Sequence, residues 1–408
     1  MSERPLLIKN GRIPDRKGGK WTAADLLISG GRIVDIGDIP SKKSYIVYDA
    51  RGNVIFPAFT DLRTNIYPPP YIRTEKIATT LSAAMYGGFS RLCAAPMQTV
   101  DAALIETLRQ EGERLGCEIF AVGSPIKPNG EPSDIDRLFE LGTIAIGHDG
   151  TADNETFYRA ACRVAANDRL MIVHANDRRL AGRLDQSFNA YKSGGEFAAL
   201  PENIATADAI TVAAASGCRM HITGVSTAYA AKLIREAKKS GLPITADTCP
   251  QYFSMTSDDL IFYGSNVKLS HPLRSERDRR AIAEAIADGT IDAISTDHKA
   301  LTTSEKSTAF ERVPCGMLGL QTAFSVSLSS LVLSGVIDLY RLCELLSFRP
   351  AEIIGANGNI EIGAPARLAV CDVDAEYLFD DAQLKTGRFV KNSPYLGQVL
   401  TGKVVKVF

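Results

Sequence analysis

Imidazole and carboxylate side chains gather at the ends of apolar segments in this chain. Four of the five histidines end or directly follow such a segment, and two aspartates stand beside them: His148, Asp149, His174, His221, Asp297 and His298. Imidazoles and carboxylates are the groups that most often transfer protons or bind metal ions in enzymes. The pattern therefore indicates a candidate active site, with a polar rim without catalytic role as the alternative.

The elements that would position these residues alternate between strand-like and helix-like patterns from about residue 54 to 345. Strands are predicted at 54–60, 89–95, 117–122, 143–147, 170–174, 219–223, 243–248 and 291–296. Helical patterns separate them at 101–115, 154–168, 204–216, 227–240 and 276–288. Eight such strands favour a parallel (β/α)₈ barrel, whose active site lies at the carboxyl ends of the strands. An open doubly wound sheet is the alternative.

Both ends of the chain have a different pattern, with short strands and glycine-containing turns. Asn10-Gly11 and Gly30-Gly31 mark hairpin-type turns near the start. We therefore expect a small composite β-sandwich domain from residues 1–52 and 356–408, and an α/β barrel from residues 53–355.

Charge and cysteine usage exclude several classes of protein. The chain has 46 basic and 47 acidic residues, which gives no overall field for nucleic acid or for an anionic membrane. Its first residues carry charges where a signal peptide would need an apolar core, so we expect no signal peptide, and no apolar run reaches membrane-spanning length. Its eight cysteines are scattered singly, as is typical of proteins in a reducing compartment. We predict a cytoplasmic location.

Colinear motifs from about residue 7 to 405 resemble the dihydroorotase and cyclic-amidohydrolase superfamily. FPAFTDLRTN resembles the segment that leads into Asp-Leu-His-x-His, and IAIGHDG resembles Asp-Asp-Gly. VHANDRRL, HITGVST and ISTDHKAL are similar to Val-His-Cys-Glu-Asp, His-Ile-x-His-Val-Ser-Thr and Ala-Thr-Asp-His-Ala-Pro-His. The resemblance implies a metal-dependent hydrolase barrel of the TIM type with a small β domain.

The same resemblance implies a metal site that has lost ligands. Arg63 and Asn65 stand where the family has His-x-His, and Gly224 stands where it has a further histidine. Asp149, His174 and Asp297 keep the family's ligand types; Asp297 matches the general base, which we expect to be vestigial. Arginine is permanently cationic and offers no lone pair to a metal. We therefore expect no metal cofactor, with one zinc ion at Asp149, His174 and Asp297 as the alternative.

The positions that grip substrate in the family are also changed. Tyr67 aligns near the arginine that binds the substrate carboxylate, Met97 with an asparagine, and Leu301 with the last histidine of its motif. A tyrosine cannot reproduce the two-bond fork of a guanidinium. These replacements argue against the same reaction.

A cation at position 63 suggests what replaces the metal. Leaving Asp149 and Asp297 buried and unpaired would be costly. Our hypothesis is that the Arg63 guanidinium lies in the vacated metal position and pairs with Asp297, Asp149 or both. The alternative is that Arg63 extends to solvent.

Three further residues could carry chemistry. His148 replaces the first aspartate of the Asp-Asp-Gly run, and a loop role is favoured over a role as a new ligand. His271 precedes Pro-Leu-Arg, where a local role is also favoured. Cys249 has a mouth-like position, but no histidine and asparagine arrangement for a nucleophile is evident.

The resemblance is strongest to non-catalytic dihydroorotase-like subunits, which support aspartate transcarbamoylase in pyrimidine biosynthesis. It implies a homodimer with aspartate transcarbamoylase as hetero-partner. The alternatives are an active dihydroorotase or other cyclic amide hydrolase with an unconventional site, and a small-molecule binding protein that uses the old pocket.

Overall fold

The computed structural model describes residues 4–67, 75–193 and 196–408. Its strands are β1 (Leu6–Asp15), β2 (Lys20–Ser29), β3 (Arg32–Gly37), β4 (Ile46–Asp49), β5 (Val54–Pro57), β6 (Phe59–Thr64), β7 (Phe89–Ala94), β8 (Glu118–Phe120), β9 (Val122–Gly123), β10 (Ala145–His148), β11 (Leu170–His174), β12 (Arg219–Thr223), β13 (Ile244–Thr248), β14 (Ala293–Ile294), β15 (Leu368–Phe379) and β16 (Gln398–Val407).

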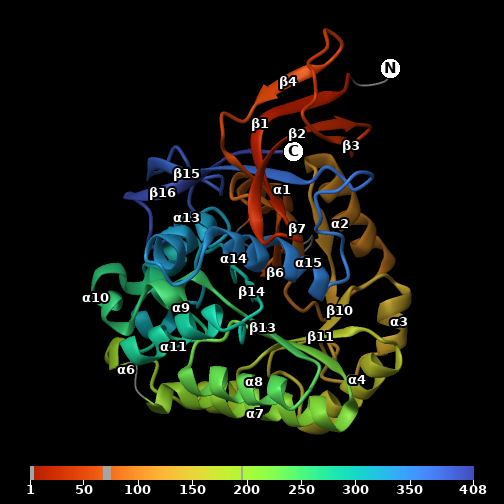
Figure 1. Ribbon diagram of the computed structural model, residues 1–408. Helices are drawn as coiled ribbons and strands as arrows, with labels where there is room; N and C mark the ends of the chain where they lie inside the picture. The colour runs from red at the N-terminus through yellow and green to blue at the C-terminus, as the bar shows by residue number, and fades with distance from the viewer. Residues whose placement is uncertain (1–3, 68–74, 194–195) are drawn as a thin grey trace.

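Helices separate and surround these strands (Figure 1). They are α1 (Ile77–Tyr86), α2 (Ala102–Leu115), α3 (Ile135–Glu140), α4 (Asn154–Ala166), α5 (Arg178–Ala181), α6 (Phe188–Ser193), α7 (Glu196–Ser216), α8 (Ala228–Lys239), α9 (Pro250–Ser254), α10 (Leu260–Tyr263), α11 (Glu276–Ala287), α12 (Thr303–Lys306), α13 (Ala323–Ser327), α14 (Leu339–Cys343) and α15 (Arg349–Ile353). In the described part of the chain, none of them is both long and apolar enough to span a membrane.

Strands β6 to β14 form the predicted barrel. Parallel pairing runs through β6-β7-β8 and through β9-β10-β11-β12-β13-β14. Isolated parallel bridges join the two groups, between Met97 and Gly123 on one side and between Thr64 and His298 on the other. Since β8 and β9 together correspond to the one predicted strand at 117–122, eight strand positions close around a common core, as the alternating pattern predicts.

The first predicted strand, 54–60, is wrong in one respect, because two strands share it. Val54–Pro57 forms β5, which pairs with β1 and β15, and the barrel strand β6 begins only at Phe59. Ala58 lies between them. All residues of β5 are buried, so hydrophobicity alone does not mark the change from one sheet to the other.

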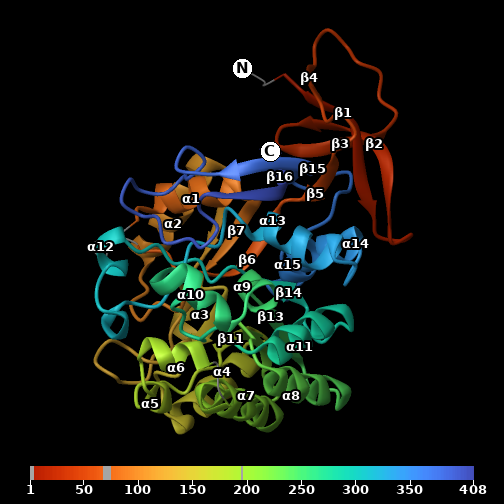
Figure 2. The ribbon, with the colours of Figure 1, turned by 90° about the vertical axis from the view of Figure 1, so that its left-hand side faces the viewer.

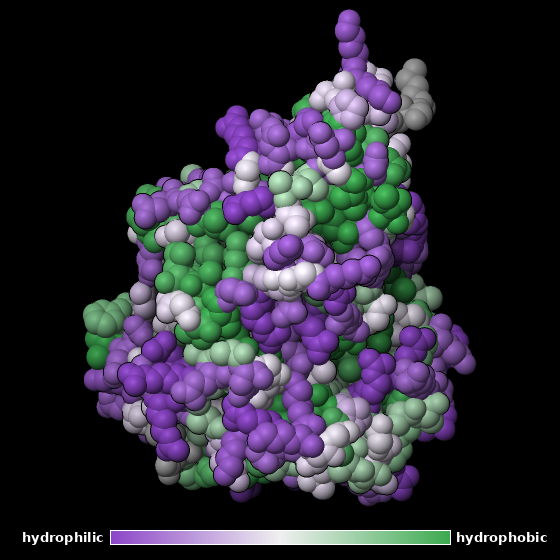
Figure 3. All heavy atoms as spheres, viewed as in Figure 1, coloured by the Kyte–Doolittle hydropathy of each residue, from purple (hydrophilic) through white to green (hydrophobic). Residues whose placement is uncertain are grey.

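Both chain ends contribute to a single seven-stranded sheet, in the order β16-β15-β5-β1-β2-β3 with β4 beside β1. Figures 1 and 2 show this sheet at one end of the molecule, where β15 from the C-terminal part of the chain pairs with β5 from the N-terminal part. Apolar side chains gather over β16 and α13 on the face seen in Figure 3. Leu378 and Val399, which pair across β15 and β16, are 49% and 64% exposed.

An aromatic cluster joins the terminal sheet to the barrel. Phe324 of α13 lies 5.6 Å from Phe56 of β5 and 5.8 Å from Phe59 of β6, measured between ring centroids. Aromatic pairs at these separations add to the stabilisation from burial. The three rings are fully buried, so they fix the two sheets against one another.

Replacing Phe324 by alanine is expected to lower the free energy of unfolding by about 3–5 kcal/mol, because a large cavity opens at this junction. Chemical denaturation measures the loss. The control is Phe389→Ala, whose ring is 67% exposed and should cost under about 1 kcal/mol. Equal losses in the two variants would contradict this role for Phe324.

Candidate active site at the barrel mouth

The predicted site residues meet at the carboxyl ends of the barrel strands. Arg63 lies in β6, His174 ends β11, and Asp149 and Asp297 follow β10 and β14 directly or within a short turn. Parallel strands present these ends at one mouth of a barrel. The fold therefore gathers residues from widely separated parts of the chain.

An ion pair joins Arg63 and Asp297 at this mouth. Arg63 Nε donates to Asp297 Oδ1 at 2.8 Å, and the two side chains are only 11% and 14% exposed. Burial alone would lower the pKa of Arg63, but Asp297 and Asp149 outweigh it and the pKa is raised. The pairing that the sequence predicted with Asp297 is confirmed.

Asp149 has a different partner, so of the pairings considered for Arg63, with Asp297, Asp149 or both, the structure shows the one with Asp297. Arg178 at the start of α5 donates from Nη2 to Asp149 Oδ2 at 2.5 Å and from Nε to the backbone oxygen of Asp149 at 2.8 Å. Thr151 donates to the other carboxylate oxygen at 2.8 Å. The carboxylate of Asp149 is thus committed to a second guanidinium.

Asn65 and Gly224 each support the backbone conformation at the mouth, one through a hydrogen bond and the other through its φ angle. Asn65 Nδ2 donates to the backbone oxygen of His298 at 3.0 Å, which ties the end of the first barrel strand to the last. Gly224 has φ of +75°, a left-handed conformation that favours glycine. A Cβ atom there would lie 3.6 Å from His174 Nδ1, so the glycine leaves open space beside that ring.

His174 is held by stacking. Its ring lies 4.3 Å from that of His271, at an interplanar angle of 20°, and its Nε2 is 3.3 Å from Ser270 Oγ. Its Nδ1 is buried and has no hydrogen-bond partner among the described residues. Burial, and then the charge of Arg63 and the neighbouring His271, lower the pKa of His174 well below its usual value. The ring is therefore neutral.

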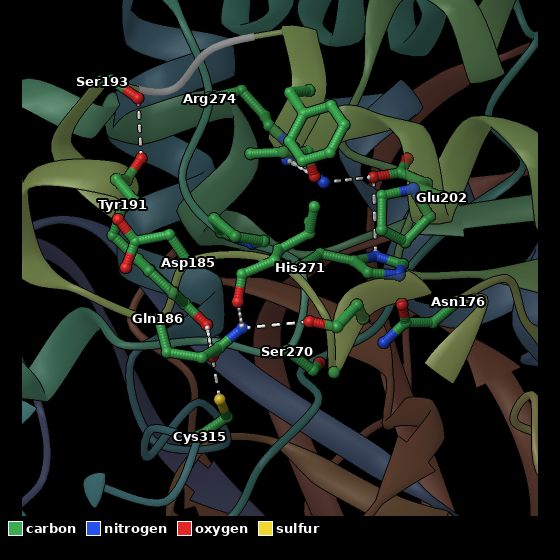
Figure 4. A pocket seen from close by; sticks show the side chains of 18 residues that line it. Asn176, Asp185, Gln186, Tyr191, Ser193, Glu202, Ser270, His271, Arg274 and Cys315 are labelled. Carbon is green, nitrogen blue, oxygen red and sulfur yellow. Dashed lines mark hydrogen bonds and ion pairs between the residues drawn. The ribbon is translucent and has the colours of Figure 1, made fainter. Parts of the chain in front are cut away.

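The sequence predicted a local role for His271, and its ring nitrogens both face backbone oxygens. Nδ1 lies 2.9 Å from Gly224 O and Nε2 lies 3.0 Å from Ala175 O. Glu202 approaches Nδ1 at 3.7 Å and accepts a hydrogen bond from Arg274 at 2.9 Å (Figure 4). This buried network fixes His271, and through stacking it fixes His174. It borders a cavity of about 330 Å³.

A larger cavity of about 920 Å³ lies at the mouth itself. All three predicted substrate positions line it: Tyr67, Met97 and Leu301. Asn65, Asp149, Arg178 and Lys299 line it as well. The structure thus brings the predicted substrate positions together around one space, with a lysine that the sequence reasoning did not single out.

The other candidate residues lie away from this cavity or deep beneath it. His148 turns toward α4, where its ring stacks on Phe157 at 4.2 Å, and burial lowers its pKa to about 4. Cys249 is fully buried, and burial and nearby carboxylates raise its pKa well above the usual value, which makes it a poor nucleophile. Asp61, two residues before Arg63, was not among these candidates; it is fully buried, and burial raises its pKa to about 6, against hydrogen bonds from Thr296 and Thr64.

The residues at the mouth do not fit a metal ion. Within the described residues, no group of three or more His, Cys, Asp or Glu side chains is placed to hold one. Asp297 is bound to Arg63 and Asp149 to Arg178, so the two carboxylates already have cationic partners. A divalent cation would also be repelled by both guanidinium groups.

Comparison with known proteins identifies the family. Residues 54–408 match the model of the amidohydrolase family. A dihydroorotase of Caldanaerobacter subterraneus subsp. tengcongensis is 32% identical over 410 residues, covering 98% of this chain and 94% of that protein. A dihydroorotase of Anaeromyxobacter dehalogenans is 33% identical over 414 residues, covering 98% and 95%.

The chain belongs to the dihydroorotase branch of the amidohydrolase family.

Solved structures confirm the fold of this amidohydrolase. An L-hydantoinase (dihydropyrimidinase) from Arthrobacter aurescens superposes with a TM-score of 0.88 at 23% identity, covering 100% of this chain and 95% of that one. A dihydropyrimidinase from Brevibacillus agri gives a TM-score of 0.85 at 22% identity, covering 99% and 93%. This chain therefore shares with these two proteins a barrel with an attached β-rich domain.

Sequence reasoning missed three residues that shape this amidohydrolase site: Arg178, Glu202 and Lys299. Arg178 follows His174 by four residues in the matched motif VHANDRRL, so a search for cations near Asp149 could have found it. Lys299 replaces the alanine of Asp-His-Ala-Pro-His, which is a visible signal. Glu202 lies in a helix outside the matched motifs, and we find no sequence signal for it.

Arg63→Met is expected to lower the free energy of unfolding by about 3 kcal/mol, because it leaves the Asp297 carboxylate buried without its partner. Denaturant titration at neutral pH measures this. The double variant Arg63→Met/Asp297→Asn removes both charges and should recover part of the loss. Arg109→Met, at an exposed ion pair, is the control and should cost under about 1 kcal/mol. A loss equal to the control's would count against a stabilising pair at the mouth.

Proposed function

We propose that this dihydroorotase-family protein does not hydrolyse cyclic amides and acts instead as a cytoplasmic structural partner of aspartate transcarbamoylase in pyrimidine biosynthesis. The observation that carries the proposal is the Arg63–Asp297 ion pair. It engages the residue that matches the family's general base and places a permanent cation where metal ligands would lie. Hydrolysis of this type needs a water activated by a metal, and a carboxylate alone supplies no such activation.

Three further features support the proposal. Asp149 is held by Arg178, and His174 is stacked on a fixed neighbour. The substrate positions have lost the guanidinium and the imidazole of the family pattern. Exposed apolar side chains at Leu333, Leu378 and Val399 offer surface that a second copy or a partner subunit could cover.

An active dihydroorotase, or another cyclic amide hydrolase with an unconventional or mononuclear metal site, is the second candidate. The relatives favour it, because the similar proteins named above are called dihydroorotases and match nearly the whole chain. A third candidate, a small-molecule binding protein, is favoured by the cavity of about 920 Å³ that persists at the mouth.

An assay of dihydroorotate hydrolysis with added zinc, with metal content measured in parallel, separates the first two candidates. We expect no turnover above background and no stoichiometric metal in the purified protein. Co-purification with aspartate transcarbamoylase from the same cell is expected. Turnover at an ordinary enzyme rate that Asp297→Asn abolishes would establish the second candidate and refute the first. Thermal stabilisation by a metabolite, with neither turnover nor co-purification, would favour the third.

Restoring the missing histidines tests the same reasoning in the other direction. The double variant Arg63→His/Asn65→His frees Asp297 and places two imidazoles on one side of β6. We expect its affinity for zinc to exceed that of the unaltered chain at least tenfold, measured by competition with a fluorescent chelator. Arg63→Lys/Asn65→Gln is the matched control and should show no gain. Equal zinc affinity in all three proteins would contradict the role assigned to Arg63.

A further inference from the structure

A third cavity, of about 390 Å³, lies beside β10 and β11 and shares no lining residue with the cavity of about 920 Å³, although His174 at the end of β11 is among the residues that line it. Val173 of β11 and His148 at the end of β10 form its inner wall. Phe157 of α4 and Ala205 and Asp208 of α7 line the opposite side. Its volume is that of a site for a small metabolite.

A buried polar side chain lines this cavity with an unpaired nitrogen. The ring of His148 is 8% exposed and stacks on Phe157, and its buried Nδ1 has no hydrogen-bond partner within the described part of the chain. Asn176, which is 9% exposed, lines the cavity as well. Buried polar groups are nearly always hydrogen-bonded, since leaving them unpaired costs free energy. The unpaired Nδ1 of His148 therefore points to a bound molecule.

The cavity is also acidic. Asp153, Asp177 and Asp208 line it, against the single guanidinium of Arg179, which is exposed. Asp153 accepts from the backbone of Thr156 at 2.8 Å as the N-cap of α4.

Asp177 caps α5 in the same way, through a backbone hydrogen bond from Leu180 at 3.0 Å. A helix N-terminus partly compensates the charge of a capping carboxylate.

Asp208 has no such compensation. It lies in the interior of α7, and among the described residues it has neither an ion pair nor a hydrogen bond. Burial, and then the charge of Asp177, raise its pKa. A cation between the two carboxylates would relieve their mutual repulsion.

We propose that this cavity binds a small organic molecule with a primary ammonium group, seated between Asp177 and Asp208. An ammonium has three N–H donors, which matches two carboxylates and one further acceptor. The carbon chain of the ligand packs along Phe157 and Val173. The side chains of Asn176 and His148 hydrogen-bond to its distal polar end. The proposal does not rest on the function proposed for the barrel mouth, although His174 of the mouth also lines this cavity.

Isothermal titration calorimetry of the full chain with putrescine, a diammonium probe, tests the proposal. We expect a dissociation constant below 1 mM and no measurable binding of 1,4-butanediol, its neutral counterpart. Asp208→Asn should weaken putrescine binding at least tenfold. Ala205→Leu, one helical turn earlier on α7, should abolish it by filling the cavity. Thermal unfolding without ligand verifies that each variant is folded.

Asp374→Asn is the matched control, since it removes one exposed carboxylate from β15 in the terminal sheet. It should leave putrescine affinity unchanged. Equal weakening by Asp208→Asn and Asp374→Asn would reveal non-specific attraction of cations and would overturn the site. Binding of 1,4-butanediol as tight as that of putrescine, or displacement of putrescine by equimolar calcium, would overturn the assignment to an organic ammonium.

Discussion

The ion pair between Arg63 and Asp297 is the constraint on which the barrel mouth depends. A carboxylate that faces the interior of a barrel needs a positive partner, since an unpaired buried charge is costly. Here the partner is a side chain at 2.8 Å. A guanidinium carries one charge in a fixed plane and directs its donors along defined lines, whereas a metal ion gathers ligands from several directions.

The residues around this ion pair fit a barrel mouth in which arginine side chains neutralise the carboxylates. Arg178 takes the other acid, Asp149, so each carboxylate has its own guanidinium. Asn65 turns to the backbone of His298 and closes the ring of strands. His174 keeps its place through stacking on a neighbour that backbone oxygens hold. The apolar core continues beneath all of them, which explains how the fold tolerates a changed site.

Much of this arrangement could be predicted from the sequence, because strand ends in a parallel barrel converge by topology alone. The meeting of Arg63 with Asp297 follows from that rule and from the cost of an unpaired buried charge. The choice between Arg178 and Arg63 as partner of Asp149 does not, since it depends on how α5 places a long side chain. The boundary between β5 and β6 at Ala58 could not be predicted from the sequence either, because both strands are buried and only their hydrogen-bond partners differ. Glu202, which contacts His271 and Arg274, could not be predicted either, because it lies in a helix outside the matched motifs.

The order of strands in the terminal sheet affects how the protein folds during its synthesis. Val54 of β5 pairs with Cys371 of β15, roughly 300 residues later in the chain. At the pace of a ribosome, about 5–20 residues per second, β5 waits on the order of 15–60 s for its neighbour. During this interval the emerging chain presents an apolar strand edge, which is a template for wrong pairing. Assembly of this sheet therefore favours rapid or chaperoned synthesis, while the barrel strands can pair as they appear.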